Sequence, residues 1–232
     1  MVFSSTVFLF VFLPVVLSGI ALLRKELHNT WLLVMSILFY AWGEPVYVLL
    51  MLLSIAGNYI FGLLVHLFRA HLFRARFIVA VAVFFNLALL GWFKYANFVI
   101  DNLNRLLPSL GIEPVLLAPI TLPLGISFFT FQALSYVIDV YRGDGKVQRN
   151  PMYVGLYISI FPQLIAGPIV RFHDVMLQIH ERVITLEGFA SGIHRFVMGL
   201  AKKVLIANIL AAPADYVFDS VPAAHLTPAL AW

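Results

Sequence analysis

Long apolar stretches follow one another along the chain, separated by short polar or charged breaks. A helix needs about 20 residues, at 1.5 Å each, to cross the roughly 30 Å apolar core of a bilayer. This ruler predicts seven helical segments, at residues 2–23, 30–42, 46–67, 77–99, 119–141, 152–170 and 189–212. At least the first five are expected to cross, and residues 215–227 are expected to form a loop. The predicted fold class is therefore all-α, a polytopic transmembrane helical bundle.

Two of these segments, 119–141 and 152–170, are interrupted by residues that disturb a helix. Proline removes a backbone donor, and glycine permits backbone angles that other residues resist. Non-helical backbone persists at membrane depth only where protein buries it or a wet cavity receives it. Both segments are thus predicted to be broken or re-entrant helices beside a pocket or channel. The interrupting residues are Pro123, Gly125, Pro162, Gly167 and Pro168.

Polar residues in and beside the broken segments are candidates for lining a substrate channel. Gln132, Ser135 and Asp139 are spaced three and four apart, so they share one helix face. Such a stripe is costly in a membrane unless it faces protein or water. Interhelical hydrogen bonding is the alternative, with Asp139 paired to Arg142 and Arg171 paired to Asp174. The candidates are Gln132, Ser135, Asp139, Gln163, Gly167, Pro168 and Arg171, of which Arg171 could bind a phosphate or carboxylate.

Composition and charge agree with a membrane protein. Hydrophobic residues make up 62% of the chain and charged residues 11%, against about 25% charged in soluble domains. The loops after the first, third and fifth segments carry most of the cations. If the first five segments all cross, these loops share one side, which the positive-inside rule makes cytoplasmic. The N-terminus is then outside, and the net charge of +4 needs no nucleic-acid partner.

Few residues suit catalysis or metal binding. The chain has no cysteine, so a disulfide, a thiolate nucleophile and a Cys-ligated metal are excluded. No His-x-x-x-His pair, Ser-His-Asp pattern or glycine-rich phosphate loop is recognisable. His173 and Asp174 are adjacent, and adjacent helical residues are not expected to face each other. The sequence therefore predicts no metal site and no catalytic residue.

The last predicted segment has a cationic face. Arg195 and Lys202 are seven residues apart and so lie on one side of a helix. This arrangement suits a helix at the cytoplasmic surface, with its cations near the lipid headgroups. An acidic partner such as an acyl carrier protein is the alternative occupant of that face.

Three blocks resemble the membrane-bound O-acyltransferase (MBOAT) family, and the closest branch looks like the bacterial alginate O-acetyltransferase subunit. The first block is Leu122-Pro-Leu-Gly-Ile-Ser-Phe-Phe-Thr-Phe-Gln132, followed by Tyr136, Asp139 and Arg142. The second is Phe161-Pro-Gln-Leu-Ile-Ala-Gly-Pro-Ile-Val-Arg171, and Gly199-Leu-Ala-Lys-Lys-Val-Leu-Ile-Ala207 is similar to a third. The resemblance covers essentially the whole chain.

The resemblance implies an O-acetyltransferase that modifies hydroxyls of an exported polysaccharide such as alginate, in the bacterial inner membrane. It implies no bound cofactor; the acetyl donor, acetyl-CoA or an acyl carrier, would be a substrate. Periplasmic or membrane acetylation partners are also expected. The family's catalytic histidine stands in a Trp-His block that this sequence lacks. Residues 1–232 are accordingly expected to be a single membrane domain, the N-terminal half of such an enzyme, inactive without the catalytic C-terminal part.

Two other functions remain open from the sequence. Broken helices with a buried polar stripe also form the binding sites of transporters. A non-catalytic scaffold in an exopolysaccharide export complex would share the same apolar composition.

Overall fold

The computed structural model describes residues 3–165 and 167–220. Regular structure among these residues is entirely helical, without a strand, which confirms the predicted all-α class. The chain divides into two compact units. The first unit is residues 10–182, and the second joins residues 3–9 to the described chain after residue 182. The prediction of one continuous domain remains untested by this division.

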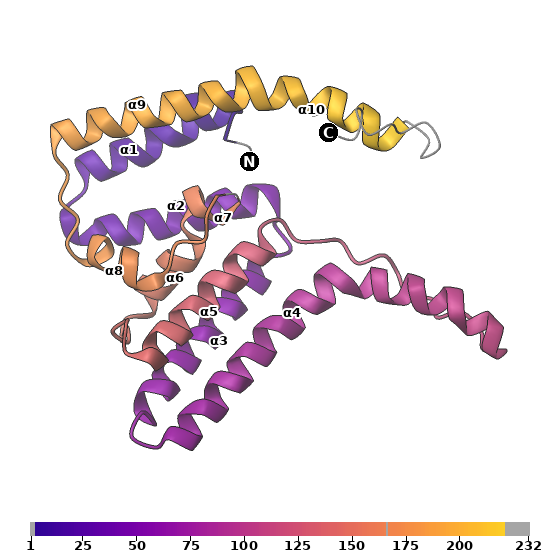
Figure 1. Cartoon of the computed structure of the whole chain (residues 1–232). Coiled ribbons are helices and arrows are strands. Elements are labelled where there is room, and N and C mark those ends of the chain that lie inside the picture. Colours follow the sequence, from indigo (N-terminus) through magenta and orange to yellow (C-terminus); the bar gives the residue numbers. More distant parts are fainter. Residues whose placement is uncertain (1–2, 166, 221–232) are drawn as a thin grey trace. The chain divides into compact units, whose positions relative to one another are not determined.

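The first unit and the turn that leads into it hold eight α-helices and three shorter helical turns among the described residues (Figure 1). In chain order these are η1 (Phe8–Phe12), α1 (Leu13–Leu22), η2 (Lys25–Leu27), α2 (His28–Gly43), α3 (Val48–Leu67), α4 (Leu72–Leu106), η3 (Leu107–Leu110), α5 (Ile126–Arg142), α6 (Pro151–Ser159), α7 (Phe161–Leu164) and α8 (Phe172–His180).

A helical hairpin, α1 and α2, begins the first unit. Gly19 allows the two helices to approach, because a β-carbon there would collide with the ring of Trp31. The Trp31 ring nitrogen Nε1 donates to the backbone carbonyl of Val16 at 3.1 Å. An indole N–H that is shielded from water needs such a partner. The Trp31 side chain therefore fills the space between the two helices while its N–H is hydrogen-bonded to α1.

Helices α3, α4 and α5 pack against one another. Gly62 of α3 leaves room for the buried Tyr136 ring of α5, which a β-carbon at this position would strike. Between α3 and α4, Asn58 and Asn86 are fully buried and exchange two amide hydrogen bonds, of 3.1 and 2.8 Å. Small residues and buried amide pairs are the usual means of joining helices in lipid, where apolar surface gives no net drive to associate.

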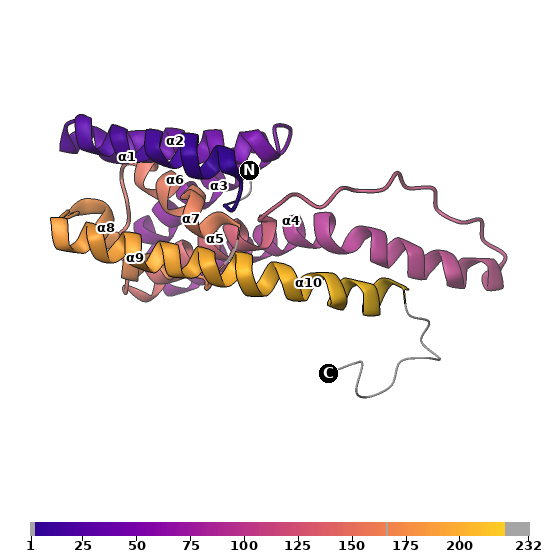
Figure 2. The ribbon, with the colours of Figure 1, turned by 90° about the horizontal axis from the view of Figure 1, so that it is seen from above.

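The second half of α4 extends away from α3 and α5 in both ribbon views (Figures 1 and 2). Its 35 residues correspond to about 52 Å, well beyond the roughly 30 Å bilayer core. A non-helical segment, residues 112–123, returns along this half. Asn97 holds it by donating to the carbonyl of Ile120 at 2.8 Å and accepting from its N–H at 3.0 Å. Asn104 binds both backbone groups of Val115 in the same way, at 3.0 and 2.8 Å.

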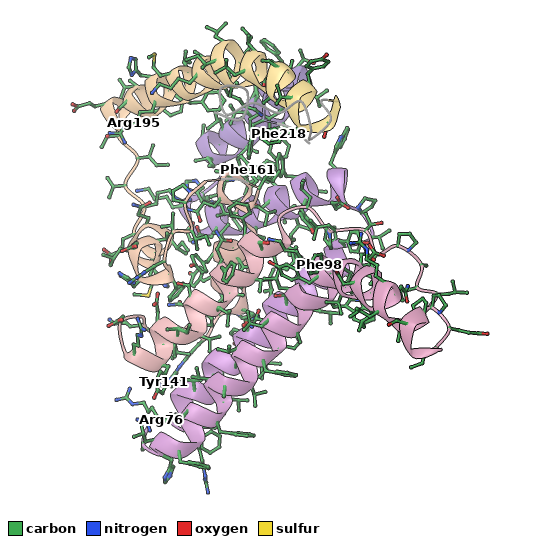
Figure 3. The ribbon with its side chains drawn as sticks, turned by 45° about the vertical axis from the view of Figure 1, so that its right-hand side comes forward. Arg76, Phe98, Tyr141, Phe161, Arg195 and Phe218 are labelled. Atoms are coloured by element: carbon green, nitrogen blue, oxygen red, sulfur yellow. The ribbon has the colours of Figure 1, made fainter. Side chains whose placement is uncertain are left out.

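Three phenylalanines join the start of the first unit to its broken segment. The rings of Phe12, Phe39 and Phe161 lie pairwise at centroid distances of 5.4, 5.3 and 5.5 Å. Tilted and edge-on pairs at this separation stabilise by about 0.5–1.5 kcal/mol beyond their burial. The cluster fixes α7 against α2 and the turn that precedes α1 (Figure 3 labels Phe161).

The second unit contains one long helical run. Its parts are α9 (Leu186–Lys202), η4 (Lys203–Ala207), α10 (Asn208–Asp215) and η5 (Tyr216–Ser220). Thr185 caps α9 by accepting from the N–H of Gly188 at 3.0 Å. No residue of α9, η4 or α10 is buried.

One predicted loop is corrected by this run. Residues 215–220 are helical, although a loop was expected from residue 215; the remainder of that loop, 221–227, lies outside the described residues. The helix continues through Pro213, with π-helical turns at both ends of α10. Proline removes one backbone hydrogen-bond donor, and this loss does not end the helix here.

Three described helices are long and apolar enough to cross a membrane: Val48–Leu67, Leu72–Ser109 and Leu186–Asp219. They include or match the predicted segments 46–67, 77–99 and 189–212. The first predicted span corresponds to a shorter apolar helix, Phe8–Leu22. The fifth begins only at Ile126 of α5, after the break expected at Pro123 and Gly125. The chain is therefore a multi-pass membrane helical bundle with the broken segments that the sequence predicts.

The Asn58–Asn86 pair yields a prediction for stability. We expect Asn86→Leu alone to lower the free energy of unfolding by about 1–3 kcal/mol, because it leaves the amide of Asn58 buried without its partner. Asn58→Leu combined with Asn86→Leu should cost less than the sum of the single changes. Unfolding of the four proteins in mixed detergent micelles, followed by tryptophan fluorescence, measures this coupling. Strict additivity would contradict the pairing.

Candidate functional site

The broken segment between α6 and α8 is held by side chains from other helices. Pro162 lies in the first turn of α7, and this helix is only four residues long. The N–H of Phe161 donates to Oγ of the buried Ser36, on α2, at 3.2 Å. Farther along, the hydroxyl of Tyr157 donates to the carbonyl of Val170 at 2.8 Å. Protein atoms thus take over backbone groups that lipid could not satisfy.

The start of α5 lies directly against the end of α7. Gly125, just before α5, has a φ of +73°, which favours glycine. A β-carbon at Gly125 would come within 2.5 Å of the carbonyl oxygen of Leu164. The positive φ and the close approach to Leu164 both require glycine at this position. The contact brings the two interrupted segments of the sequence together.

An amide pair joins these two segments. Gln132 of α5 is 1% exposed, and its Nε2 donates to Oε1 of Gln163 on α7 at 3.1 Å. The other amide atom of Gln132, Oε1, is buried without a hydrogen-bond partner among the described residues. An unsatisfied buried acceptor costs about 1–3 kcal/mol, so this amide is suited to accept from a polar group that is not part of the chain's own helices.

Two buried hydroxyls share this property. Tyr40 OH and Thr130 Oγ1 also lack a partner among the described residues. Thr130 lies on α5, two residues before Gln132, and the ring of Tyr40 packs edge-on against Phe129 of the same helix, 6.4 Å between centroids. Buried polar groups without a partner are few in native proteins and call for an explanation. All three lie on α5 or on a residue packed against it.

Ser135 and Asp139 meet the N-terminus of α8. Oγ of Ser135 accepts from the N–H of Phe172 at 3.3 Å, and Oδ2 of Asp139 accepts from the N–H of His173 at 3.2 Å. These are the first two residues of α8, whose N–H groups have no partner inside the helix. A carboxylate at this end is also favoured by the helix dipole. The predicted partner of Asp139, Arg142, is wrong; α5 instead supplies a cap to a helix 34 residues away.

His173 lies between two carboxylates. Its Nδ1 is 3.4 Å from Oδ2 of Asp139, and its Nε2 is 3.0 Å from Oδ1 of Asp174. Both contacts are hydrogen bonds only when both ring nitrogens carry protons. The expectation that adjacent residues do not face each other is wrong here, because Nε2 of His173 contacts the carboxylate of the next residue, Asp174.

The far end of α8 is fastened to α2 and to the loop after α5. Nε2 of His180 lies 2.9 Å from Oε1 of Gln148, and the carbonyl of Ile179 accepts from the amide of Asn29 at 2.8 Å. Arg182 donates to the other amide atom of Asn29 at 3.4 Å. Burial lowers the pKa of the Arg182 guanidinium from its usual value, but arginine remains charged at neutral pH.

No family model and no solved structure matches the chain, whereas curated proteins do. The chain is 44% identical to a protein from Pseudomonas aeruginosa named probable alginate O-acetylase AlgI, over 94% of the chain and 42% of that protein. A protein of the same name from Azotobacter vinelandii is also 44% identical, over 94% of the chain and 44% of its own length. A Helicobacter pylori protein named peptidoglycan O-acetyltransferase is 32% identical, with coverages of 94% and 47%.

This similarity supports the resemblance to the membrane-bound O-acyltransferase family that the three sequence blocks indicate. The chain spans less than half the length of each of these relatives.

The structure brings together only some of the candidate channel residues. Gln132 meets Gln163, while Ser135 and Asp139 meet α8. The remaining three candidates are exposed on the broken segment: Gly167, Pro168 and Arg171. Arg171 forms no ion pair with Asp174 in the described structure. That all seven line a channel remains a prediction. No group of three potential metal ligands occurs among the described residues.

Sequence reasoning missed Tyr40, Thr130, Tyr157 and Ser36. Each is a hydroxyl within a largely apolar run, although Ser36 and Tyr40 are four residues apart and share one face of α2. A further signal was the position of Tyr40, which precedes the Trp42-Gly-Glu-Pro45 break at the end of α2.

Capping of α8 yields a second prediction. We expect Asp139→Ala to destabilise the first turn of α8, at a cost of about 1 kcal/mol, because the N–H of His173 loses its acceptor. Hydrogen–deuterium exchange of residues 172–175 should become faster, with Asp139→Asn intermediate because an amide oxygen still accepts. Asp174→Asn is the matched control, since that carboxylate is 54% exposed and binds only the His173 ring. Unchanged exchange in Asp139→Ala would contradict the cap.

Proposed function

We propose that the protein of which this chain forms part transfers acetyl groups to hydroxyls of an exported polysaccharide. The observation that carries the proposal is the 44% identity, over 94% of the chain, to a protein named alginate O-acetylase. The Helicobacter pylori relative's name specifies the same transferred group and a different glycan. Acetylation of a glycan hydroxyl is therefore common to both names, and alginate is the finer proposal, supported by the more similar relatives.

The proposed location is the bacterial inner membrane, with the N-terminus periplasmic. Basic loops support this orientation, because cations are retained on the cytoplasmic side. Figure 3 places Arg76, at the start of α4, and Tyr141, at the end of α5, at the same end of the first unit. Those positions adjoin two of the basic loops. The acetyl donor, acetyl-CoA or an acyl carrier, would then approach from that end.

The chain's part in the reaction is proposed to be structural and substrate-facing. An alcohol is a poor nucleophile until a base takes its proton. The histidine that the resemblance implies for this step is expected in a Trp-His block that this sequence lacks. The unsatisfied Oε1 of Gln132 supports a role in accepting a hydrogen bond from a polar substrate group. Periplasmic or membrane acetylation partners would complete the assembly.

Replacing Gln132 tests the substrate-facing role in the full-length protein. We expect Gln132→Leu to lower acetylation of the exported polysaccharide about tenfold, the effect of losing about 1.4 kcal/mol of binding. Gln132→Glu should also lower acetylation, because a charged side chain at this depth in the membrane is costly. The measurement is acetyl content per sugar, by NMR of polysaccharide from cells expressing equal amounts of each variant.

Gln178→Leu provides a matched control, because it is the same change at an exposed position of α8. It should leave acetylation within twofold of the unmodified protein. Normal acetylation by Gln132→Leu would remove Gln132 from the substrate path. Loss of polysaccharide export, with normal acetyl content on what remains, would instead support a scaffold or transport function.

Residues 1–232 by themselves are expected to have no transferase activity. Radiolabelled acetyl-CoA, a glycan acceptor and the chain reconstituted in vesicles provide the assay, with the full-length protein as the positive control. Acetyl transfer by the chain alone would place a catalytic residue within these 232 residues, against the proposal.

A further inference from the structure

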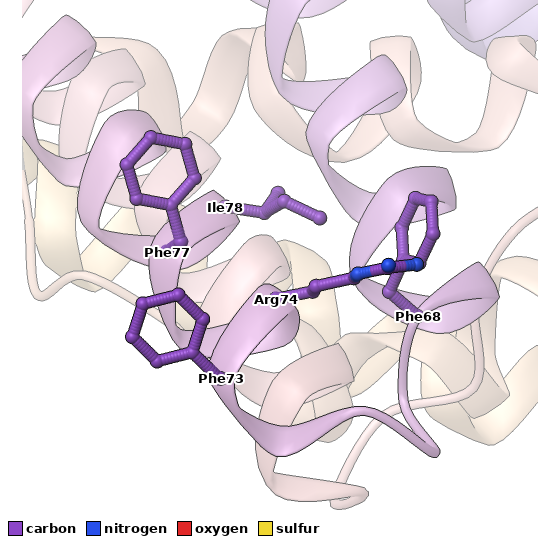
Figure 4. Close-up of a pocket in the computed structure, with 5 residues that line it drawn as sticks. All are labelled: Phe68, Phe73, Arg74, Phe77 and Ile78. Carbon is purple, nitrogen blue, oxygen red and sulfur yellow. The ribbon is translucent and has the colours of Figure 1, made fainter.

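A shallow cavity of about 240 Å³ lies at the turn between α3 and α4. We call it the Arg74 pocket; its lining residues are Phe68, Phe73, Arg74, Phe77 and Ile78. Figure 4 shows Arg74 directed toward Phe68, with Phe73 and Phe77 on the opposite side. No residue of the Gln132–Gln163 or Asp139–His173 contacts contributes to it.

The lining of the pocket is apolar except for one cationic group. The guanidinium carbon of Arg74 lies 5.6 Å from the centroid of the Phe68 ring, within the range of a cation–π contact. The planar guanidinium retains several N–H donors, which match the oxygens of a phosphate. The pocket thus offers a phosphate-binding group beside a hydrocarbon surface.

No acidic side chain forms an ion pair with the arginines of the α3–α4 turn in the described structure. Arg69, Arg74 and Arg76 are exposed, and none forms an ion pair among the described residues. The sequence contains no Asp or Glu between Glu44 and Asp101. A cluster of three unpaired cations attracts anionic lipid headgroups at a membrane surface.

The position of the pocket corresponds to the boundary of the membrane. The apolar helix Val48–Leu67 ends immediately before it, and Leu72–Ser109 begins within it. Phe73 is 84% and Phe77 63% exposed, so their rings face the surroundings rather than the protein. Exposed phenylalanine rings are wholly apolar, so lipid acyl chains solvate them better than water does.

We propose that the Arg74 pocket binds an anionic phospholipid of the leaflet that the α3–α4 turn faces. The lipid phosphate accepts hydrogen bonds from the Arg74 guanidinium, while Arg69 and Arg76 add to the attraction. The part of the acyl chain nearest the headgroup lies along Phe77 and Ile78. A free phosphate would leave the phenylalanines unused, and a zwitterionic lipid would bring no net charge to the three arginines.

Lipid titration of the whole chain in uncharged detergent micelles tests the site. Native mass spectrometry would count bound phosphatidylglycerol and phosphatidylcholine, and thermal unfolding would follow the same titrations, with inorganic phosphate as a third arm. We expect phosphatidylglycerol to bind and to raise the melting temperature, and the other two to do neither. Arg74→Gln should weaken phosphatidylglycerol binding about fivefold, the effect of one interfacial cation.

Two further variants keep the test decisive. Phe77→Ala should also weaken phosphatidylglycerol binding, because the acyl chain loses its contact. Arg105→Gln, an exposed arginine near the other end of α4, should leave it unchanged. The proposal would be overturned if Arg74→Gln or Phe77→Ala bound phosphatidylglycerol as well as the unmodified chain does, or if Arg105→Gln lost as much binding as Arg74→Gln. It would also be overturned if phosphatidylcholine bound as well as phosphatidylglycerol, or if inorganic phosphate stabilised the chain as much.

Discussion

Water does not reach the backbone inside a bilayer, so every peptide group that leaves a helix ladder must be bonded by protein. The first unit meets this constraint with side chains rather than with further helix. Ser36 accepts the N–H that opens α7, Tyr157 donates to the carbonyl of Val170, and Ser135 and Asp139 take the first N–H groups of α8. The chain can therefore turn twice within a short distance without leaving these groups to lipid.

This constraint separates two kinds of residue on the polar face of α5. Ser135 and Asp139 are already engaged by α8, so their first duty is to hold the broken segment in place. Gln132 lies on the same face, but half of its amide has no partner in the described structure. Some side chains of this polar face therefore hold other parts of the chain, whereas the Gln132 carbonyl oxygen still lacks a hydrogen bond. Only such an unpaired group lowers its free energy by accepting a hydrogen bond from a substrate.

Sequence reasoning recovered the elements that depend on local chemistry. Pro123, Gly125 and Pro162 marked the breaks, because proline and glycine act on their own backbone wherever they stand. The partners of Asp139 were not recoverable, since spacing along one helix suggests Arg142 and says nothing of His173, 34 residues away. The helical continuation past Pro213 was missed for the converse reason: a local rule was outweighed by the ladder around it.

Asn97 and Asn104 of α4 have a consequence for the segment that they hold. Asn97 and Asn104 bind only backbone N–H and C=O groups of Ile120 and Val115. The path of residues 112–123 is thereby held at two points, Val115 and Ile120, with no demand on the side chains between them. The exposed side chains of Leu116, Leu117 and Ala118, which lie between these two points, can therefore be replaced, for example to attach a label, without removing any of the four hydrogen bonds.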